Sequence, residues 1–378
     1  MAFVVFWVTF ALLGYAFIGY PLLLKIAAVL SGQRSNYDER YTLTVSLILS
    51  VFNEEAVIAE KIGNFQSLDY PSDHLEFVII SDGCEDKTEE IVRSYSNIDP
   101  RIRLFGQEQR GGKTLALNRG VAESQGDVLL FTDANSMFDK DAIRKLIRHF
   151  ADPGIGLVSG RSVYLDAVGR GERSGGAYRS YEETIKEGES RIGSIIGADG
   201  AIYALRREIY EPLQPCFIND FLHTLQAVLK GYRAISDSEA ICREVVDENY
   251  EGEFRRQTRI MAQSWLIFVT QIGPLVRRGG LVYVWEFVSH KLLRWLTLPL
   301  VLVLLIANLS LLSTGAFYGV FLGIQGCVAL LALAGATGRG GGIGRAAHLF
   351  VVLHAAALLG LWRMLRGEMF VTWNPRSN

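Results

Sequence analysis

The stretch DVLLFTDANS, residues 127–136, decides the fold of this chain. Its apolar run, Val128 to Phe131, is short and has turn-forming residues on both sides, which predicts a strand buried on both faces. The run is followed by Asp133 and Asn135, two oxygen-bearing side chains separated by one small residue. At the carboxyl end of a parallel strand, such a pair can hold a divalent cation against a diphosphate. A polar loop without chemistry is the alternative, because a two-residue motif has little specificity by itself.

Short apolar runs with similar flanks recur before and after this stretch. The runs that we predict to be strands are 43–51, 75–80, 102–105 and 155–163. Helical patterns end at Phe65, cover 88–95 and cover 115–124, so strands and helices alternate along the chain. This alternation predicts an α/β fold with a mostly parallel, Rossmann-like sheet, whose ligands bind beyond the carboxyl ends of the strands.

Polar side chains follow three of the predicted strands. Asn53 and Glu54 come after the first strand, Asp82 comes after the second, and Asp133 comes after the central one. Because the carboxyl ends of parallel strands lie at one edge of a sheet, we expect these four side chains to converge on one crevice. Asp82 precedes a glycine that favours a tight turn. It either accepts hydrogen bonds from the base or ribose of a nucleotide or is an ordinary turn aspartate.

The loop Gly111-Gly112-Lys113-Thr114 is rich in glycine but does not have the spacing of a phosphate-binding P-loop. The first glycine of a P-loop would stand where this sequence has Gln107. Lys113 therefore has two interpretations outside that motif. It either neutralises a diphosphate or is a solvated loop lysine.

Two later stretches place carboxylates where a ligand can approach. Asp199 lies among small residues that include Gly197 and Gly200, a composition that permits either close approach of a ligand or tight packing of a strand on a helix. Asp220 stands at the start of the amphipathic stretch 221–230. There it is a helix N-cap or first-turn residue, or a carboxylate general base that faces the crevice.

A basic stretch, 254–259, ends in Arg259. A helix face that meets lipid headgroups explains such a stretch, and a contact with a phosphate group is the alternative. The next stretch, 263–276, is mostly apolar and is closed by two arginines. This pattern predicts an amphipathic helix that lies in a membrane interface.

Three long stretches carry no charged residue. They are 1–24, 295–338 and 346–362, whereas 34–294 holds nearly all of the charge. Since about 20 apolar residues cross the hydrocarbon core, the first stretch is long enough to span a membrane and the second is long enough for two crossings. The third is marginal in length, and it either crosses, lies in the interface or re-enters.

The charges that flank the first apolar stretch indicate its orientation. Its positive residues come after the apolar run, whereas a cleaved signal peptide has them before it. We therefore predict an uncleaved anchor with the charged region in the cytoplasm. The predicted organisation is a transmembrane anchor at 1–30, a soluble domain at 31–262, interfacial amphipathic helices at 263–294 and a C-terminal transmembrane region with two or three segments at 295–378.

The composition excludes several classes of protein. Lys and Arg number 38 against 40 for Asp and Glu, so the net charge of −2 gives no electrostatic case for binding nucleic acid. The four cysteines are far apart and lack metal-ligand spacing, which indicates free thiols in a reduced compartment. The histidines do not cluster with carboxylates at helical spacing, so the sequence does not predict a zinc hydrolase.

The ordered motifs of the chain resemble those of membrane-anchored family 2 glycosyltransferases, which include bacterial polysaccharide synthases of the cellulose, chitin and hyaluronan type. The motifs are SVFNEE (50–55), SDGCED (81–86), GGKTLALNRG (111–120), FTDANS (131–136), GADGAIYALRR (197–207) and NDF (219–221). The resemblance covers about residues 43–265 and implies a GT-A fold. It also implies an inverting transfer of a sugar from a nucleoside-diphosphate sugar, usually a UDP-sugar, with Mg²⁺ or Mn²⁺ as cofactor.

The resemblance also implies a role for each matching residue. Asp133 and Asn135 match the DxD motif that holds the metal and the diphosphate, and Asp220 matches the catalytic base. Residues that match substrate-binding positions lie near the nucleoside, the diphosphate or the acceptor sugar: Asn53, Glu54, Asp82, Lys113, Gly197, Asp199, Gly200 and Arg259. The implied location is the bacterial inner membrane, with membrane lipids and other polysaccharide-assembly proteins as partners.

Three motifs depart from the family pattern. The second acid of DxD is the amide Asn135, so we expect weaker or altered metal binding. The Thr-Glu-Asp motif is Ile218-Asn219-Asp220, which keeps the base and loses its acidic neighbour. The Gln-x-x-Arg-Trp motif of processive synthases keeps only Arg259.

These departures leave three hypotheses about the function open. The first is transfer to a growing cell-surface or extracellular polysaccharide or oligosaccharide. The second is transfer of a single sugar to a lipid, either a polyprenyl phosphate or a glycolipid. The third is a non-catalytic membrane protein that binds nucleotide sugars.

Overall fold

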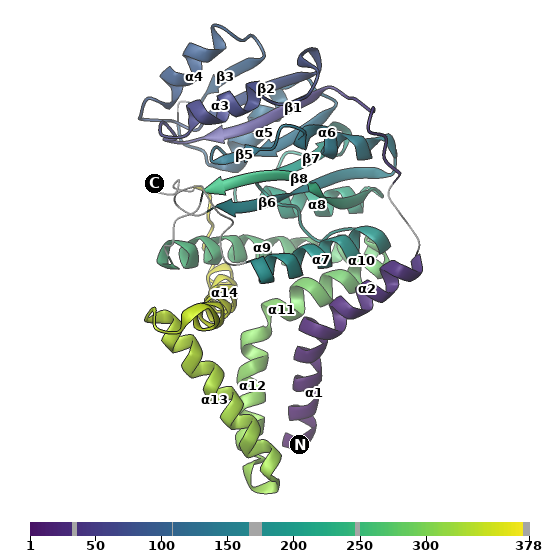
Figure 1. The fold of residues 1–378 in the computed structure, drawn as a ribbon, viewed down its shortest axis with the longest axis vertical. Helices are drawn as coiled ribbons and strands as arrows, with labels where there is room; N and C mark the ends of the chain where they lie inside the picture. The colour runs from purple at the N-terminus through teal and green to yellow at the C-terminus, as the bar shows by residue number, and fades with distance from the viewer. Residues whose placement is uncertain (32–35, 108, 166–175, 246–249, 373–378) are drawn as a thin grey trace. The chain divides into compact units, whose positions relative to one another are not determined.

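The computed structural model spans the 378 residues and describes all of them except 32–35, 108, 166–175, 246–249 and 373–378 (Figure 1). The chain divides into two compact units. The sheet unit comprises Ala27–Glu248, Leu266–Tyr283 and Met369–Asn378. The helical unit comprises Met1–Ile26, Asn249–Trp265 and Val284–Glu368.

The first half of the sheet unit has the predicted alternation of strands and helices. Its strands are β1 (Val45–Val51), β2 (Leu75–Ser81), β3 (Ile102–Gly106) and β4 (Val128–Thr132), and neighbouring pairs are parallel. The intervening helices are α3 (Ile58–Gln66), α4 (Thr88–Ser96) and α5 (Lys113–Glu123). Every residue of β1 and β4 is buried, as expected for parallel strands covered on both faces.

The second half of the sheet unit mixes parallel and antiparallel strands. Its strands are β5 (Ser136–Phe138), β6 (Ile155–Leu165), β7 (Ile202–Arg206) and β8 (Arg233–Val245). All eight strands form one sheet in the order β3-β2-β1-β4-β7-β6-β8-β5, in which β7 runs antiparallel to β4 and β6 (Figure 1). The sequence predicted β6 but not the other three strands. The helices of this half are α6 (Ala142–Ile147), α7 (Gly176–Ile192) and α8 (Asn219–Leu229).

Side chains on the two faces of β1 pack in two separate hydrophobic clusters. Leu47 and Leu49 pack in the larger cluster with Phe65 of α3. Ile48 packs in the other with Leu117 of α5 and Phe131 of β4.

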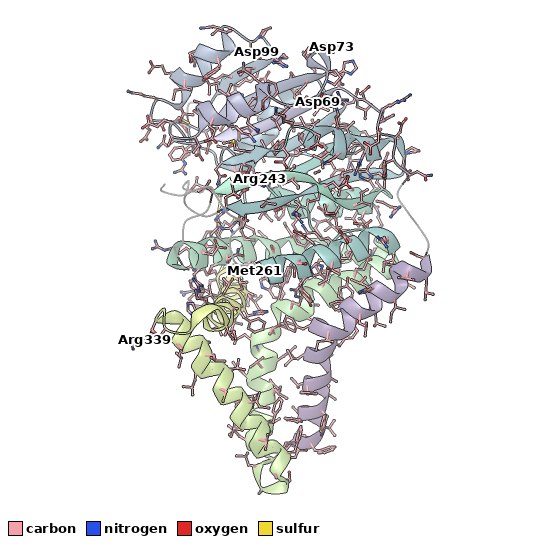
Figure 2. The ribbon with its side chains drawn as sticks, viewed as in Figure 1. Asp69, Asp73, Asp99, Arg243, Met261 and Arg339 are labelled. Carbon is pink, nitrogen blue, oxygen red and sulfur yellow. The ribbon has the colours of Figure 1, made fainter. Side chains whose placement is uncertain are left out.

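At the margin of the sheet, the Arg243 guanidinium of β8 forms an ion pair with Asp139, with 2.8 Å between Nε and Oδ1 (Figure 2).

The helical unit contains long apolar helices. They are α1 (Ala2–Gly14) and α2 (Tyr20–Ser31), joined by the π-helix Tyr15–Gly19, then α12 (Thr297–Leu309), α13 (Ala316–Ala336) and α14 (Gly341–Leu365). The last residues of α2, from Ala27, are assigned to the sheet unit. Three helices of the described chain are long and apolar enough to cross a membrane: Ala2–Ser31, Ala316–Ala336 and Gly341–Leu365. A bent pair, Gly280–Trp295 and Thr297–Leu309, meets at 64° and would make a fourth crossing if it forms one span.

One buried polar side chain of the helical unit bonds to a neighbouring helix. The amide of Asn308 on α12 is fully buried and donates to the Tyr318 carbonyl and to the Gln325 side chain, both at 3.2 Å. The helix α9 (Tyr250–Arg278) carries Met261 (Figure 2) and contacts Gly360 of α14. The contact is so close that a Cβ on Gly360 would lie 2.8 Å from the Cβ of Met261. The third uncharged stretch of the sequence, 346–362, whose length is marginal for a membrane crossing, lies within the 25-residue helix α14.

Candidate active site

The residues that follow β1 fasten two loops of the candidate site together. Asn53 is the one described non-glycine residue with a positive φ, 53°, and its Oδ1 accepts a hydrogen bond of 2.8 Å from the Glu85 backbone N–H. The Glu54 backbone N–H donates to the Thr88 hydroxyl at 2.8 Å. The two bonds join the end of β1 to the loop after β2 and to the first residue of α4, so the ends of β1 and β2 lie at one edge of the sheet as predicted.

The Asp82 carboxylate holds the glycine-rich loop. Asp82 is fully buried and accepts hydrogen bonds from the Gly111 N–H at 2.7 Å and from the Gly112 N–H at 3.0 Å. Gly112 has a φ of +88°, and a Cβ there would lie 2.2 Å from the Val371 carbonyl oxygen, so only glycine fits. The loop in turn fixes Lys113 as the first residue of α5.

The Lys113 ammonium lies in hydrogen-bond contact with the Asp133 carboxylate. Lys113 reaches this position from the start of α5, and Asp133 follows β4, so a cation and a carboxylate from two elements meet at the end of the central strand. Both side chains are partly exposed, 27% and 40% respectively, and remain accessible to a ligand. Lys113 is therefore an ion-paired residue and not a freely solvated loop lysine.

The oxygen ligands at this strand end suit a divalent cation that a substrate helps to hold. Asp133 and Asn135 offer a carboxylate and a neutral amide oxygen. Within the described part of the chain, no group of three or more His, Cys, Asp or Glu side chains can hold a metal by itself. Mg²⁺ sites commonly combine one or two carboxylates with phosphate oxygens and water, so the residues present fit a cation completed by a diphosphate.

The Glu54 carboxyl lies in an environment that disfavours its ionised form. Burial, followed by the nearby charges of Asp133 and Asp86, raises the pKa of Glu54 to about 7, and the Lys113 charge opposes this shift. Because the Asp133 charge raises the pKa of Glu54, the two carboxyl groups are electrostatically coupled. A cationic ligand at Asp133 would therefore favour the ionised form of Glu54.

A buried lysine that the sequence interpretation missed supports the turn after β4. Lys61 of α3 is 1% exposed, and its ammonium donates to the Thr132 hydroxyl at 2.8 Å and to the Ser136 carbonyl. Burial lowers the pKa of Lys61 to about 8. The available signal was its position between Ile58 and Ile62 on the apolar face of a helix.

The loop that contains Gly197, Asp199 and Gly200 is braced by its own carboxylate. The Asp199 carboxylate accepts hydrogen bonds from the Ser162 N–H at 3.0 Å and from the Ala201 N–H at 3.2 Å. These bonds anchor the loop to β6 and to the start of β7. Asp199 thus has a structural role, and the ligand contact of Asp199 remains a prediction.

This loop lies directly against Asp220, the second residue of α8. A Cβ on Gly200 would lie 3.0 Å from Asp220 Oδ2. The Thr224 hydroxyl donates to the Asp220 carbonyl at 2.6 Å and accepts from the Ala198 N–H at 3.1 Å. The structure therefore brings the 197–200 loop and Asp220 together, and it places Asp220 in the first turn of a helix.

A polar pocket of about 110 Å³ adjoins Asp199 and is bounded by β6, α7 and β8. Its charged lining residues are Arg161, Glu182, Glu183, Lys186, Glu187 and Asp199, so carboxylates outnumber cations. Three serine hydroxyls complete the polar lining: Ser162, Ser236 and Ser238. Hydroxyls and carboxylates are suitable partners for the hydroxyl groups of a ligand.

Arg259 belongs to the helical unit, on α9, where its guanidinium donates to Gln263 at 3.5 Å. On the same helix, Arg256 forms an ion pair with Glu253, with 2.8 Å between Nη2 and Oε1. The predicted phosphate contact of Arg259 remains a prediction.

Comparison with known proteins identifies the sheet unit. Residues 46–213 match the model of glycosyl transferase family 2. A beta-monoglucosyldiacylglycerol synthase of Synechocystis is 32% identical over 154 residues, which are 40% of this chain and 32% of that protein. A poly-beta-1,6-N-acetyl-D-glucosamine synthase of Staphylococcus aureus is 26% identical over 235 residues, which are 59% of this chain and 55% of that protein. The chain thus spans about one third to one half of these curated relatives.

A solved structure resembles nearly the whole chain. A mannosyltransferase from Pyrobaculum calidifontis, determined with GDP-Man and Mn²⁺, matches 96% of this chain and 99% of its own with a TM-score of 0.73 at 22% identity. The mostly parallel mixed sheet is that of the GT-A fold, as predicted. Residues 46–213 thus carry a family 2 glycosyltransferase domain, the family that the motifs of the sequence predicted.

Proposed function

We propose that this chain is an inverting glycosyltransferase that takes a sugar from a nucleoside-diphosphate sugar, with a UDP-sugar as the expected donor. The observation that carries the proposal is the Lys113–Asp133 contact at the end of β4. A cation and a carboxylate side by side can hold both components of a metal diphosphate, because Lys113 pairs with phosphate oxygens and Asp133 with the metal. Asn53 and Glu54 lie beside the nucleoside in this proposal, and Asp82 shapes that part of the site through the glycine-rich loop that it holds.

Mg²⁺ or Mn²⁺ is the proposed cofactor, held by Asp133 and Asn135 together with the donor. When bound, the cation supplies positive charge that stabilises the leaving diphosphate. Lys113 adds a second positive charge. Lys61 holds the carbonyl and hydroxyl groups of the supporting turn in place.

Asp220 is the proposed general base. Its carboxylate removes the proton from an acceptor hydroxyl, and the resulting oxygen attacks the anomeric carbon of the donor sugar. A bond forms between that oxygen and the anomeric carbon, while the bond to the diphosphate oxygen breaks and the diphosphate leaves with the electron pair. Attack opposite to the leaving group inverts the anomeric configuration. Gly197, Asp199 and Gly200 lie along the acceptor side.

The acceptor in this proposal is a growing cell-surface polysaccharide or oligosaccharide at the bacterial inner membrane, with the sheet unit in the cytoplasm. The pocket beside Asp199 supports a saccharide, because its excess of carboxylates disfavours a phosphate and its hydroxyls suit sugar hydroxyls. A lipid acceptor is the second candidate. It is favoured by the likeness to the monoglucosyldiacylglycerol synthase and by Ile260, which stands where processive synthases have Trp.

The test uses full-length protein in native membrane lipids with a panel of nucleotide sugars and either Mg²⁺ or Mn²⁺. The proposal predicts nucleoside diphosphate release with at least one donor and its loss in Asp133→Ala. A large labelled product would establish the polysaccharide acceptor, and a small product that extracts into organic solvent would establish the lipid acceptor. Donor binding without release under every condition would favour the non-catalytic reading.

A further inference from the structure

Asn219, directly before the proposed base, belongs to a buried chain of hydrogen bonds. Its side chain is 5% exposed, and its Nδ2 donates to the Tyr203 hydroxyl at 2.6 Å. The Tyr203 hydroxyl lies 2.9 Å from Nδ1 of His223. Tyr203 belongs to β7, whereas Asn219 and His223 lie one turn apart on α8, so the chain joins the helix to the sheet.

The amide nitrogen of Asn219 only donates, so the Tyr203 oxygen accepts that bond. The Tyr203 hydroxyl is then free to donate its own proton to Nδ1 of His223, which it does when the neutral imidazole carries its proton on Nε2. Burial lowers the pKa of His223 to about 3 and holds the pKa of Tyr203 well above its usual range, so both groups are neutral near pH 7.

The same three residues connect Asp220 to the central strand. The Tyr203 ring stacks on Phe131 of β4 with 4.8 Å between centroids, and the His223 ring lies 5.1 Å from Phe131. Phe131 is two residues before Asp133. The hydrogen-bonded side chains of Asn219, Tyr203 and His223 thus link β4, which is followed by the proposed metal ligands, to α8, which carries the proposed base.

We propose that Asn219, Tyr203 and His223 are positioning residues that set the Asp220 carboxylate relative to the end of β4, and that this geometry requires an amide at position 219. A carboxylate at 219 would accept the Tyr203 proton, so His223 Nδ1 would lose this donor and the imidazole would have to change its tautomer to keep a bond to the Tyr203 oxygen. The carboxylate would also place a second negative charge beside Asp220. The synthase motif has an acid at the position of Asn219. We infer that this chain has an amide there because Tyr203 and His223 require a hydrogen-bond donor at that position. This inference rests on the proposed role of Asp220.

Tyr203→Phe tests the positioning role, and Tyr210→Phe is its matched control. The Tyr210 hydroxyl also donates to a side chain, Asn118 Oδ1 at 2.6 Å, and its ring lies 5.2 Å from that of His223, but its bond leads to α5 instead of α8. We expect Tyr203→Phe to lower kcat by about tenfold to a hundredfold, because small misplacements of a catalytic group are costly. The donor KM should stay within about twofold in both variants.

Asn219→Asp tests the requirement for an amide. The expected result is an acidic limb of the kcat–pH profile that lies about one pH unit higher than in the wild type, because a neighbouring carboxylate disfavours ionisation of the base. Equal kcat in Tyr203→Phe and Tyr210→Phe at matched thermal stability, or an unchanged acidic limb in Asn219→Asp, would overturn the inference.

Asp220→Asn separates failure of this inference from failure of the proposed function. If Asp220→Asn keeps full turnover, the assignment of the base is wrong and the positioning role is lost with it. If Asp220→Asn is inactive while Tyr203→Phe behaves as Tyr210→Phe, the base assignment stands and only the positioning role is wrong.

Discussion

Lys113 and Asp133 form a close ion pair between the first turn of α5 and the end of β4. In the protein without ligand, the lysine thus occupies the carboxylate that we assign to the metal. The Lys113 ammonium and a metal ion compete for the same Asp133 oxygen atoms, so loss of the lysine should have opposite effects on metal binding and on turnover.

Lys113→Met should bind Mn²⁺ several-fold more tightly than the wild type in the absence of donor, because Asp133 is no longer neutralised. The same variant should lose about a hundredfold in kcat, because a positive charge on the leaving diphosphate is missing. Titration with Mn²⁺ and nucleoside diphosphate release measure the two effects. Lys145→Met is the control, since it removes a lysine that pairs with Asp141 at 2.8 Å on α6. Weaker Mn²⁺ binding by Lys113→Met would argue against this competition.

Gly200→Ala should lower turnover by about tenfold while donor affinity stays unchanged, because its Cβ would press on Asp220 from a position that is now 3.0 Å from Oδ2. Steady-state kinetics with a titrated donor separate the two quantities. Gly63→Ala on α3 is a matched control, since no atom lies within 4 Å of a Cβ there. If Gly200→Ala and Gly63→Ala had the same kcat, the close contact with Asp220 would be unimportant.

Glu54 predicts a pH dependence of stability in the metal-free protein. Its pKa is raised from 4.5 to about 7, so the folded state binds more protons than the unfolded state between these values. The contribution of Glu54 to the free energy of unfolding therefore falls as the pH rises through this window. In Glu54→Gln this loss is absent, so the Tm of the variant minus that of the wild type should increase from about pH 5 to about pH 8.

Thermal unfolding in the presence of a chelator measures this difference. Glu60→Gln, at an exposed position of α3, controls for the loss of one carboxyl group. A Tm difference for Glu54→Gln that stays constant across the window would mean that the Glu54 carboxyl is not held in its neutral form by burial and by Asp133.

The parallel half of the sheet was predictable because its signals are local. Strands such as β1 and β4 are mostly apolar and buried throughout. The rule that ligands bind beyond parallel strand ends pointed to Asp133 without knowledge of contacts. The strand β8 lacks such a run, since its buried positions alternate with polar ones such as Arg243. The strand β7 follows a glycine-rich segment that equally suited a ligand loop.

The parts of the site that the sequence did not predict depend on contacts between distant residues. Lys61 and Thr132 are 71 positions apart, and nothing near Lys61 in the sequence indicates that its ammonium meets the end of β4. Asn219 stood out only as a departure from a motif. Its role became visible once the fold brought it to Tyr203, with which it shares a buried hydrogen bond.

The most direct test of the central claim compares Asp220→Asn with wild-type protein in the same lipid preparation. Donor binding is measured by titration with the active nucleotide sugar and Mn²⁺, and turnover by release of nucleoside diphosphate in the presence of acceptor. The account predicts donor affinity within about twofold of the wild type and a loss of turnover of at least about a hundredfold, as expected when a general base is removed. Turnover equal to that of the wild type would contradict the assignment of Asp220 and the mechanism built on it.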